Sequence, residues 1–469
     1  MSQHQVDVRP PWGRLAALSI QHVLIMYTGC VTVPLVFGAA LKLSQSDIAF
    51  LISADLLVAG IITAIQGFGL GKIAGVRLPI ICGATFTGLT PMILIAHKYG
   101  IQAVYGSMLI GGVVGLALAI PFARIIRFFP ALVTGAVLTV VGLSLIGVAG
   151  GLIVGSDSSS PDYAAPRNLL IAAIVVVIAV ALLCLGRGIW AQLAILFSLI
   201  AGTAITAAMG MFHLSGVGQA GWVGMPTPFH FGAPQFPIAA IVSMSIVMAV
   251  VFAESTASML AVSEITGKPL STGDLTRGLI GDGLSGILAG IFGGFIDTVF
   301  GQNVGAVETS RVHSRFVTAG SGLILIVLAL IPKMGALIAA LPGPVVGAVG
   351  LVLFGTVAMV GIRTLATVDL AKPVNLTIAA TAVGVGLLPE FVPDMFTKLP
   401  DSMQIIFGSG ITLTAIVAFV LNIVFYHTPL RRRVDDEPVV TATTDILVAT
   451  ETGTASTSTA TETNAKTHV

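Results

Sequence analysis

The sequence predicts an all-α polytopic membrane protein of about 14 transmembrane spans, built as two inverted seven-span repeats. The first observation is composition: 55% of the 469 residues are hydrophobic and only 9% are charged, and the mean hydropathy is +1.01. Soluble domains carry about 25% charged residues. The second observation is that apolar stretches long enough to cross a hydrocarbon core of about 30 Å recur from end to end. The third is an internal sequence match between the two halves.

Breaks at polar or Pro/Gly clusters divide the chain into successive spans. They lie near residues 16–39, 48–70, 79–97, 102–122, 129–152, 168–185, 189–212, 238–262, 276–293, 297–313, 316–334, 337–361, 371–390 and 404–427. With alternate loops on opposite sides, 16 of the 22 Lys and Arg residues share one side and five share the other, with Lys466 in the tail. Positive residues favour the cytoplasm, so both termini are expected inside. The first span lacks a cleavage pattern and is expected to be retained.

The internal match joins PALVTGAV at Pro130 to Val137 with PGPVVGAV at Pro342 to Val349, at an offset of 212 residues. The two segments begin the fifth and twelfth predicted spans, so the repeat unit contains seven spans. An odd number of spans forces the second copy to enter the membrane upside down, which is the inverted repeat of secondary transporters.

Two spans at equivalent places in the repeats are expected to be broken. The third begins RLPIICGATFTGLTPM and the tenth begins FIDTVFGQNVGAVETS; each passes from an extended run through glycine into a helix. Extended backbone at this depth must pair within the protein or border a polar cavity. We therefore expect two facing short strands, followed by helix N-termini near Thr87 and Asn303 that point into the same space.

The remaining segments contain few candidate functional residues. Cys30, Cys82 and Cys184 fall within apolar spans and are expected to be packing residues, so no disulfide, metal site or cofactor is predicted. The run GSDSSSPDYAAP is expected to be an external loop, and the Thr/Ser-rich tail from Val439 onward is expected to be disordered.

Charged and amide side chains inside the spans are the candidate functional groups, since a charge at mid-bilayer costs about 2.5 to 3.5 kcal/mol even on the mildest scale. Glu254 lies in the middle of the eighth span with no Lys or Arg nearby, and of these candidates we expect it to have the most apolar surroundings. It is either a ligand and proton site or a protonated acid bonded to a neighbouring helix. Gln302, at the break in the tenth span, offers one acceptor and two donors, which suit a cyclic amide edge or a helix cap. Asn303 is as well suited to holding the broken helix as to touching a ligand.

Other polar candidates have more local interpretations. His22 is mid-helix in the first span, where a histidine most often bonds another helix. Asp282 in the ninth span is either a structural pin or part of a proton relay. Glu308 is expected to pair with Arg311 or Arg315, three and seven residues away. Phe86 either stacks on a flat ligand or packs in the core.

The segment QNVGAVETSR resembles the signature of the nucleobase/ascorbate transporter family: Gln or Glu, Asn, any residue, Gly, four variable residues, Thr, then Arg, Lys or Gly. The matching residues are Gln302, Asn303, Gly305 and Arg311, with Ser310 in the usual Thr position. The resemblance extends to Gln21 and His22, to Glu254, to Asp282 and Gly283, and to Ser314 and Arg315. It covers about residues 15 to 430.

The resemblance implies a fold with a core and a gate. The expected segments are a cytoplasmic N-terminus at 1–15, core spans at 16–122 and 238–334, gate spans at 129–212 and 337–427, and a cytoplasmic disordered tail at 428–469. It also implies that Glu254, Gln302 and the backbone at Phe86 and Gly301 bind the nucleobase. The PALVTGAV and PGPVVGAV segments are then expected to line opposing helices between a moving core and a fixed gate.

Gln at position 302, where uracil permeases carry Glu, resembles the purine branch. The resemblance implies uptake of xanthine or uric acid, with protons and the lipid bilayer as further partners, no nucleic acid, and a homodimer left open. Glu254 is expected to take up a proton outside and release it inside, because burial disfavours its ionised form; no sodium cage is identified. The alternatives are a uracil/pyrimidine permease, an anion transporter of the same fold, and a channel. A membrane enzyme is not expected, because the sequence shows no HExxH motif or convincing Ser/His pair.

Overall fold

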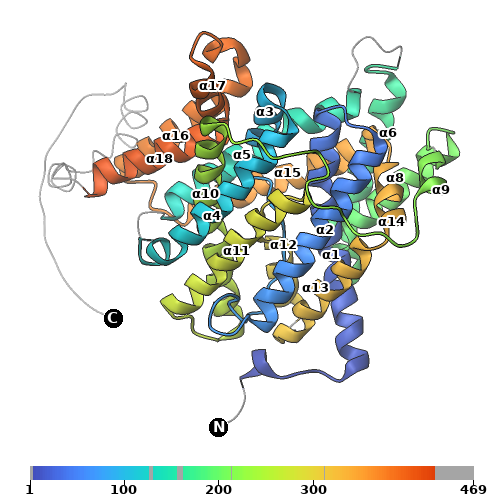
Figure 1. Cartoon of the computed structure of the whole chain (residues 1–469), viewed down its shortest axis with the longest axis horizontal. Coiled ribbons are helices and arrows are strands. Elements are labelled where there is room, and N and C mark those ends of the chain that lie inside the picture. Colours follow the sequence, from blue (N-terminus) through green and yellow to red (C-terminus); the bar gives the residue numbers. More distant parts are fainter. Residues whose placement is uncertain (1–3, 126–129, 156–161, 213, 311, 428–469) are drawn as a thin grey trace, which may run out of the picture. The chain divides into compact units, whose positions relative to one another are not determined.

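The structure is a computed structural model that describes residues 4–125, 130–155, 162–212, 214–310 and 312–427. It is almost entirely helical (Figure 1). The chain divides into a first unit, Met1–Ile423, and a second, Val424–Val469, of which the end of the last helix is described. In chain order the elements are η1 (Gln5–Asp7), α1 (Trp12–Ala40), α2 (Gln45–Phe68), β1 (Cys82–Ala84), α3 (Leu89–Tyr99), α4 (Ile101–Ile125), α5 (Ala131–Val154), α6 (Pro166–Leu185), α7 (Ile189–Gln192), α8 (Ala194–Ala208), α9 (Ser215–Gln219), α10 (Ile238–Thr266), α11 (Thr272–Phe292), β2 (Asp297–Val299), α12 (Gly301–Ser310), α13 (Arg315–Ala329), α14 (Pro332–Ala339), α15 (Gly343–Ala366), α16 (Pro373–Phe391), η3 (Pro393–Phe396), α17 (Asp401–Gly408) and α18 (Gly410–His427).

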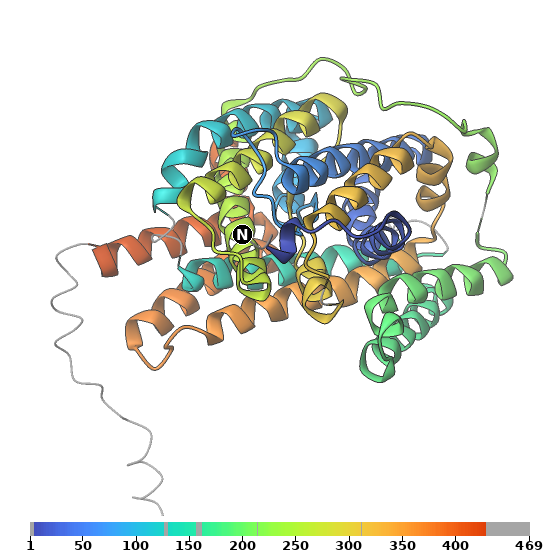
Figure 2. The same ribbon diagram turned by 90° about the horizontal axis from the view of Figure 1, so that it is seen from below.

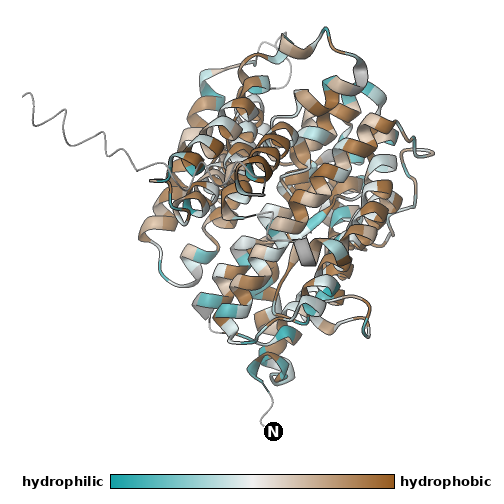
Figure 3. Cartoon of the chain, turned by 90° about the vertical axis from the view of Figure 1, so that its left-hand side faces the viewer, coloured by the Kyte–Doolittle hydropathy of each residue, from teal (hydrophilic) through white to brown (hydrophobic). Residues whose placement is uncertain are grey.

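These elements follow the predicted spans in order. Nine helices among the described residues are long and apolar enough to cross a membrane. Shorter pieces correspond to the other five predicted spans: β1 with α3, α7 with α8, β2 with α12, α13 alone, and α17 with α18. Apolar residues dominate these helices (Figure 3). The prediction of a helical membrane fold with short strands in spans 3 and 10 is confirmed. The predicted tail at 428–469 lies outside the described residues, as does half of the predicted external loop, residues 156–161.

The predicted boundary between spans 11 and 12 is wrong. Pro332 starts a separate short helix, α14, which meets α13 at an angle of 82°. A proline at the first helical position is favourable because its missing N–H would be unpaired there anyway. The twelfth span therefore begins at Gly343, with Pro342 as its N-cap, and not near residue 337.

Helix packing follows the inverted repeat. α4 packs extensively on α11, and α2 packs extensively on α13, side by side in Figure 1. α4 and α11 are the fourth and ninth spans. The spans seven places away from them in the chain are the eleventh and second, α13 and α2, so the first pair corresponds to the second. The same shift of seven places relates the pair α10 and α4 to α1 and α13, and the pair α15 and α6 to α5 and α16. The two inverted seven-span halves that the sequence predicts are therefore present.

The two helices that begin with the matched segments, α5 and α15, pack on each other, so that each segment lies against the far end of the other helix. α5 and α15 cross so closely that a methyl group at Gly135 would lie 2.9 Å from the backbone nitrogen of Leu365 and 3.0 Å from the carbonyl oxygen of Gly361. At Gly347 a methyl group would lie 2.6 Å from the carbonyl oxygen of Ala149. Both glycines lie between α5 and α15, which are helices of the predicted gate. The expected place of these segments between a moving core and a fixed gate stays a prediction.

The two strands form an antiparallel pair at the breaks of spans 3 and 10. Cys82 is opposite Val299, Gly83 opposite Thr298 and Ala84 opposite Asp297. Further backbone bonds extend the pairing at both ends: Thr85 N–H donates to Ile296 O (2.8 Å), and Phe300 N–H donates to Ile81 O (2.9 Å). Gly83 leaves room for the Phe300 ring, which would lie 2.9 Å from a methyl group there.

Hydroxyl groups from three helices satisfy the outward-facing backbone of this sheet. Thr63 of α2 accepts from Cys82 N–H (2.9 Å) and donates to Cys82 O (3.2 Å). Ser255 of α10 accepts from Val299 N–H (3.3 Å), and Ser285 of α11 accepts from Asp297 N–H (2.9 Å). Irregular backbone inside a membrane requires such internal partners.

A long extended connection joins α9 to α10 (Figure 2). Its backbone contacts three other segments in turn: Gly224 N–H donates to Leu330 O (3.1 Å), Phe229 N–H to Ile291 O (2.8 Å), and Gln235 N–H to Gln102 O (3.1 Å). These bonds tie the connection to the ends of α13, α11 and α4.

Candidate functional site at the broken spans

Glu254 lies near the middle of α10 and faces the start of α3. Thr87 Oγ1 donates a 3.2 Å hydrogen bond to Glu254 Oε2. The adjacent Ala253 and Ser255 are buried, whereas Glu254 keeps some exposed surface within a 29-residue apolar helix. A carboxyl group at this depth is costly next to lipid, so we expect its exposed part to face the protein interior and not the bilayer.

The next residue, Ser255, fixes α10 to β2. Its Oγ lies 3.1 Å from Thr298 Oγ1, besides accepting from Val299 N–H. Because β2 leads through Phe300 into α12, these bonds hold Glu254 beside the start of α12.

The start of α12 is open. Gly301 is exposed, and a methyl group at either Gly301 or Gly305 would meet no atom within 4 Å among the described residues. The first N–H groups of a helix have no acceptor within the helix and carry a partial positive charge. The side chain of Gln302 lies outside the described residues, so its role as a ligand stays a prediction; its backbone is in the first turn of α12.

Phe86 connects this region to a predicted gate helix. Its side chain is 7% exposed, and its ring makes an edge contact with Phe354 of α15, with centroids 5.4 Å apart and planes at 82°. Thr87 N–H donates to Thr85 Oγ1 (3.1 Å), which holds the turn that precedes α3. The aromatic ring thus packs on α15, while the backbone beside it lies next to Glu254 through Thr87.

Asn303 and His22 contact each other. Asn303 is 1% exposed and His22 is 2% exposed. Asn303 Nδ2 donates to His22 O (3.3 Å) and lies 3.3 Å from His22 Nδ1. These contacts join α12 to α1 and do not cap α12. The structure therefore places both side chains in a helix-to-helix contact.

Asp282 is the most deeply buried of the candidate acids, and the expectation that Glu254 has the most apolar surroundings stays a prediction. Asp282 is fully buried, and neither carboxyl oxygen has a hydrogen-bond partner among the described residues.

Sequence reasoning missed two further acids at this depth, Asp55 in α2 and Asp297 in β2, which are 1% and 0% exposed. The available signal was a carboxyl within an apolar stretch: Asp55 lies inside the second predicted span, in SADLLVAG, and Asp297 begins the tenth, in FIDTVF. Of the cysteines, Cys30 and Cys82 are buried and unbridged, and Cys184 is exposed.

The expected pairing of Glu308 with Arg315 is wrong. α12 ends at Ser310 and a new helix starts at Arg315, so the two residues do not share a helix face. Arg315 Nε instead pairs with Asp7 Oδ1 at 2.6 Å, and Lys268 Nζ lies 3.3 Å from Asp7 Oδ2. The alternative partner, Arg311, lies outside the described residues.

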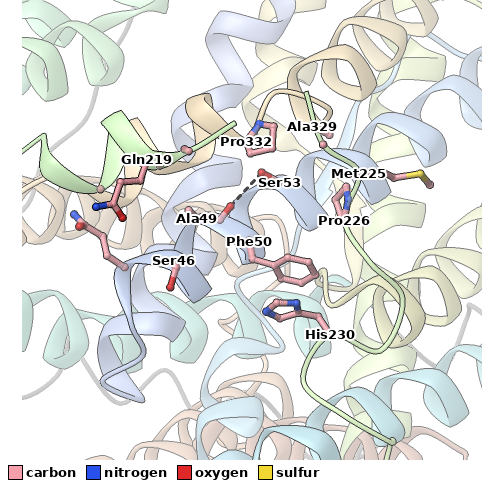
Figure 4. A pocket seen from close by; sticks show the side chains of 15 residues that line it. Ser46, Ala49, Phe50, Ser53, Gln219, Met225, Pro226, His230, Ala329 and Pro332 are labelled. Carbon is pink, nitrogen blue, oxygen red and sulfur yellow. Dashed lines mark hydrogen bonds between the residues drawn. The ribbon is translucent and has the colours of Figure 1, made fainter. Parts of the chain in front are cut away.

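A separate cavity of about 390 Å³ lies at the start of α2 (Figure 4). The ring of His230 stacks on Phe50, with centroids 3.8 Å apart, and Met225 and Pro226 come from the α9–α10 connection. None of the predicted site residues lines it. The cavity is therefore distinct from the region around Glu254.

Known proteins resemble this chain over most of its length. Residues 13–395 match a family described as the Permease family. The uric acid transporter UacT of Escherichia coli (strain K12) is 40% identical over 416 residues, covering 88% of this chain and 86% of the relative. The xanthine permease of Bacillus subtilis (strain 168) is 36% identical over 430 residues, covering 92% and 98%. The transmembrane domain of a cyanobacterium bicarbonate transporter, BicA, shares the fold with a TM-score of 0.57 and 14% identity, covering 89% of this chain and 99% of that one.

The family match and the two relatives indicate the same family as the QNVG segment at the start of α12. The chain belongs to this permease family, in the xanthine and uric acid permease branch of the nucleobase/ascorbate transporters.

Proposed function

We propose that this chain takes up a purine nucleobase, xanthine or uric acid, through the inner (plasma) membrane by proton symport with alternating access. Two relatives are a uric acid transporter and a xanthine permease. The observation that carries the proposal is the partly exposed Glu254 carboxyl, which is held by Thr87 on a helix that packs against α12, whose start is open.

The chemistry of this region suits a purine edge. A carboxylate accepts N–H bonds from a ring, and such charge-assisted bonds contribute about 1.5 to 3 kcal/mol. The N–H groups at the start of α12 are directed toward ring carbonyl oxygens. The Gln302 amide, carried by the first turn of α12, supplies donors and an acceptor for an adjacent C=O and N–H.

Contacts between predicted core and gate helices support alternating access. Phe86, next to the site, packs on Phe354 of α15. Gln21 of α1 donates from Nε2 to Gln192 Oε1 of α7 at 2.9 Å. Both contacts join a predicted core span to a predicted gate span. Movement of the core spans against the gate spans would therefore break and remake them.

Proton coupling follows from the position of Glu254. The group that accepts purine N–H bonds is also a titratable acid in a membrane interior, where its charged form is disfavoured. Proton uptake and substrate binding would then act through one carboxyl. Its negative charge also argues against the anion-transporter alternative, because no Lys or Arg among the described residues is paired with Glu254.

The specificity test uses cells that lack their own purine transporters. Labelled xanthine uptake should saturate and be competed by uric acid more strongly than by uracil. Gln302→Glu should weaken xanthine uptake at equal membrane abundance, because it removes two donors at about 1 to 3 kcal/mol each. Gln219→Glu, which adds the same charge at an exposed site in α9, is the control. Uptake competed equally by uracil, or an unchanged KM in Gln302→Glu, would contradict the proposal.

A further inference from the structure

The segment that precedes α1 is fastened to the connection between α12 and α13. Ser314 Oγ donates a 2.7 Å hydrogen bond to Val8 O, and His313 Nδ1 lies 3.2 Å from Gln5 Oε1. Val6, which lies between Gln5 and Val8 in the chain, is fully buried. This part of the N-terminal segment is therefore a fixed part of the fold.

A hollow of about 330 Å³ opens between this segment, the first turns of α1 and the α12–α13 connection. Arg9 and Arg14 line it from the α1 side, and His313 lines it from the connection. Among the described residues no acidic side chain lines the hollow. The acid of the N-terminal segment, Asp7, is already paired with two cations of its own. The hollow therefore gathers two arginines without an anion to neutralise them.

Neither arginine has an anionic partner elsewhere. In the described part of the chain, the side chains of Arg9 and Arg14 form no ion pair and no hydrogen bond. Arg9 instead stacks on Trp12, with its Cζ 3.7 Å from the centre of the ring. A stacked guanidinium keeps the N–H groups at its edge available, and this planar set of donors matches a phosphate group in a bidentate way. Two such groups with unused donors therefore suit a phosphate.

Trp12 indicates that the hollow lies at the level of lipid headgroups. It is the first residue of α1, a 29-residue apolar helix, and it is 73% exposed. Tryptophan is enriched at the boundary between a bilayer and water, where its ring lies among the headgroups. Further along the same helix, Ile20 and Leu24 are 50% and 36% exposed, as expected of a helix that borders acyl chains. At this depth the phosphate source within reach is a phospholipid.

We propose that the hollow binds the phosphate of an anionic phospholipid headgroup, with Arg9 and Arg14 as the phosphate ligands. The sequence predicts this end of α1 on the cytoplasmic side, where membranes carry anionic lipid and basic pockets bind its headgroups. A zwitterionic headgroup carries its own ammonium group, which the two arginines repel, so the hollow selects lipids of net negative charge. Lipid binding does not require transport, so this inference does not rest on the proposed function.

The test reads lipid contact at Trp12 in the reconstituted full chain. Trp190→Phe and Trp222→Phe leave Trp12 as the single tryptophan. The protein is placed in phosphatidylcholine vesicles with a minority of phosphatidylglycerol, and bromine atoms, which quench tryptophan fluorescence, are carried by one lipid or the other in parallel samples. Each arginine should favour the anionic lipid about fivefold, so the hollow should prefer phosphatidylglycerol by about 25-fold. Brominated phosphatidylglycerol should therefore quench Trp12 by more than its share of the lipid.

Arg9→Gln and Arg14→Gln, made in this single-tryptophan protein, should each reduce the preference about fivefold, and the double variant should abolish it. The control combines Arg187→Gln with Arg363→Gln, which removes two exposed arginines predicted on the same side of the membrane and should keep the preference. Comparison of the two brominated lipids within one protein cancels any change in Trp12 emission that follows from loss of the Arg9 contact.

Equal quenching by the two lipids without the arginine substitutions, or an equal loss of preference in the control, would overturn the proposal. Inorganic phosphate, added at constant ionic strength, should leave the preference unchanged; its loss would show that the hollow takes free phosphate and would overturn the lipid assignment. Folding is checked by the elution profile in detergent. If the double variant does not fold, salt decides: the preference should shrink at about 1 M NaCl, where the Debye length is about 3 Å, and a preference that salt leaves unchanged would overturn the proposal.

Discussion

Thr63 provides the sharpest test of the broken-span architecture. The residue is fully buried, and its hydroxyl is the partner for both backbone groups of Cys82 on the outer edge of β1. Thr63→Val keeps the shape of the side chain but leaves the Cys82 N–H and C=O unpaired in the membrane interior. At about 1 to 3 kcal/mol for each group, the loss is about 2 to 6 kcal/mol.

Thr63→Ser is the matched control, because it keeps the hydroxyl and removes one methyl group, at a cost of about 1 kcal/mol. Thermal unfolding in detergent should place Thr63→Val well below Thr63→Ser, and xanthine uptake should follow the same order. Equal melting temperatures for the two variants would refute the claim that this hydroxyl supports the strand.

Three further predictions concern other contacts. Phe354→Ala removes the edge contact with Phe86, worth about 0.5 to 1.5 kcal/mol, so the KM for purine uptake should rise about two- to tenfold. Gly135→Ala forces a methyl group against the backbone of α15 and should destabilise the protein by about 1 to 3 kcal/mol, whereas Gly150→Ala on the same helix meets nothing within 4 Å and should not. Although partial burial of Asp7 acts to raise its pKa, the hydrogen bond and charge of its arginine partner and a nearby lysine hold that pKa below the ordinary 3.8. The Asp7 contacts therefore stabilise the fold above pH 3.8 and lose this effect as the pH falls through the lowered pKa. Asp7→Asn should reduce the free energy of unfolding by less than about 1 kcal/mol at pH 7, and so lower the melting temperature slightly, but not at pH 2.

Each of these predictions has a contradicting result. An unchanged KM in Phe354→Ala would separate the aromatic contact from substrate binding. Equal melting temperatures for Gly135→Ala and Gly150→Ala would show that α5 and α15 are not in close contact. A melting-temperature difference for Asp7→Asn that is the same at pH 7 and pH 2 would show that the carboxylate charge is not responsible.

Span order and the two breaks could be predicted because they depend on local patterns. Long apolar runs set the spans, and extended residues followed by glycine at Gly83 and Gly301 indicated the strands. The partners of those strands could not be predicted in the same way. Thr63, Ser255 and Ser285 lie in other spans, and nothing local distinguishes a serine that binds a strand from one that binds its own helix.

The site was predicted only in part for the same reason. Glu254 was identified because a lone carboxyl in an apolar span needs an explanation, but its bond to Thr87 depends on packing between spans 3 and 8. Glu308 and Arg315 were assigned to one helix because their spacing fits, yet the chain starts a new helix between them. Asp55 and Asp297 were not singled out, because their burial depends on how α2 and β2 pack against the rest of the fold.

The central claim is that one carboxyl, Glu254, links purine binding to the proton gradient. The most direct measurement is xanthine accumulation in proteoliposomes with an imposed pH gradient, with and without Na⁺, for the wild type and Glu254→Gln. Glu264→Gln, an exposed position on the same helix, is the control. The wild type and the control should concentrate xanthine in response to the pH gradient without Na⁺, and Glu254→Gln should not. Accumulation that requires Na⁺ and ignores the pH gradient, or normal accumulation by Glu254→Gln, would contradict the account.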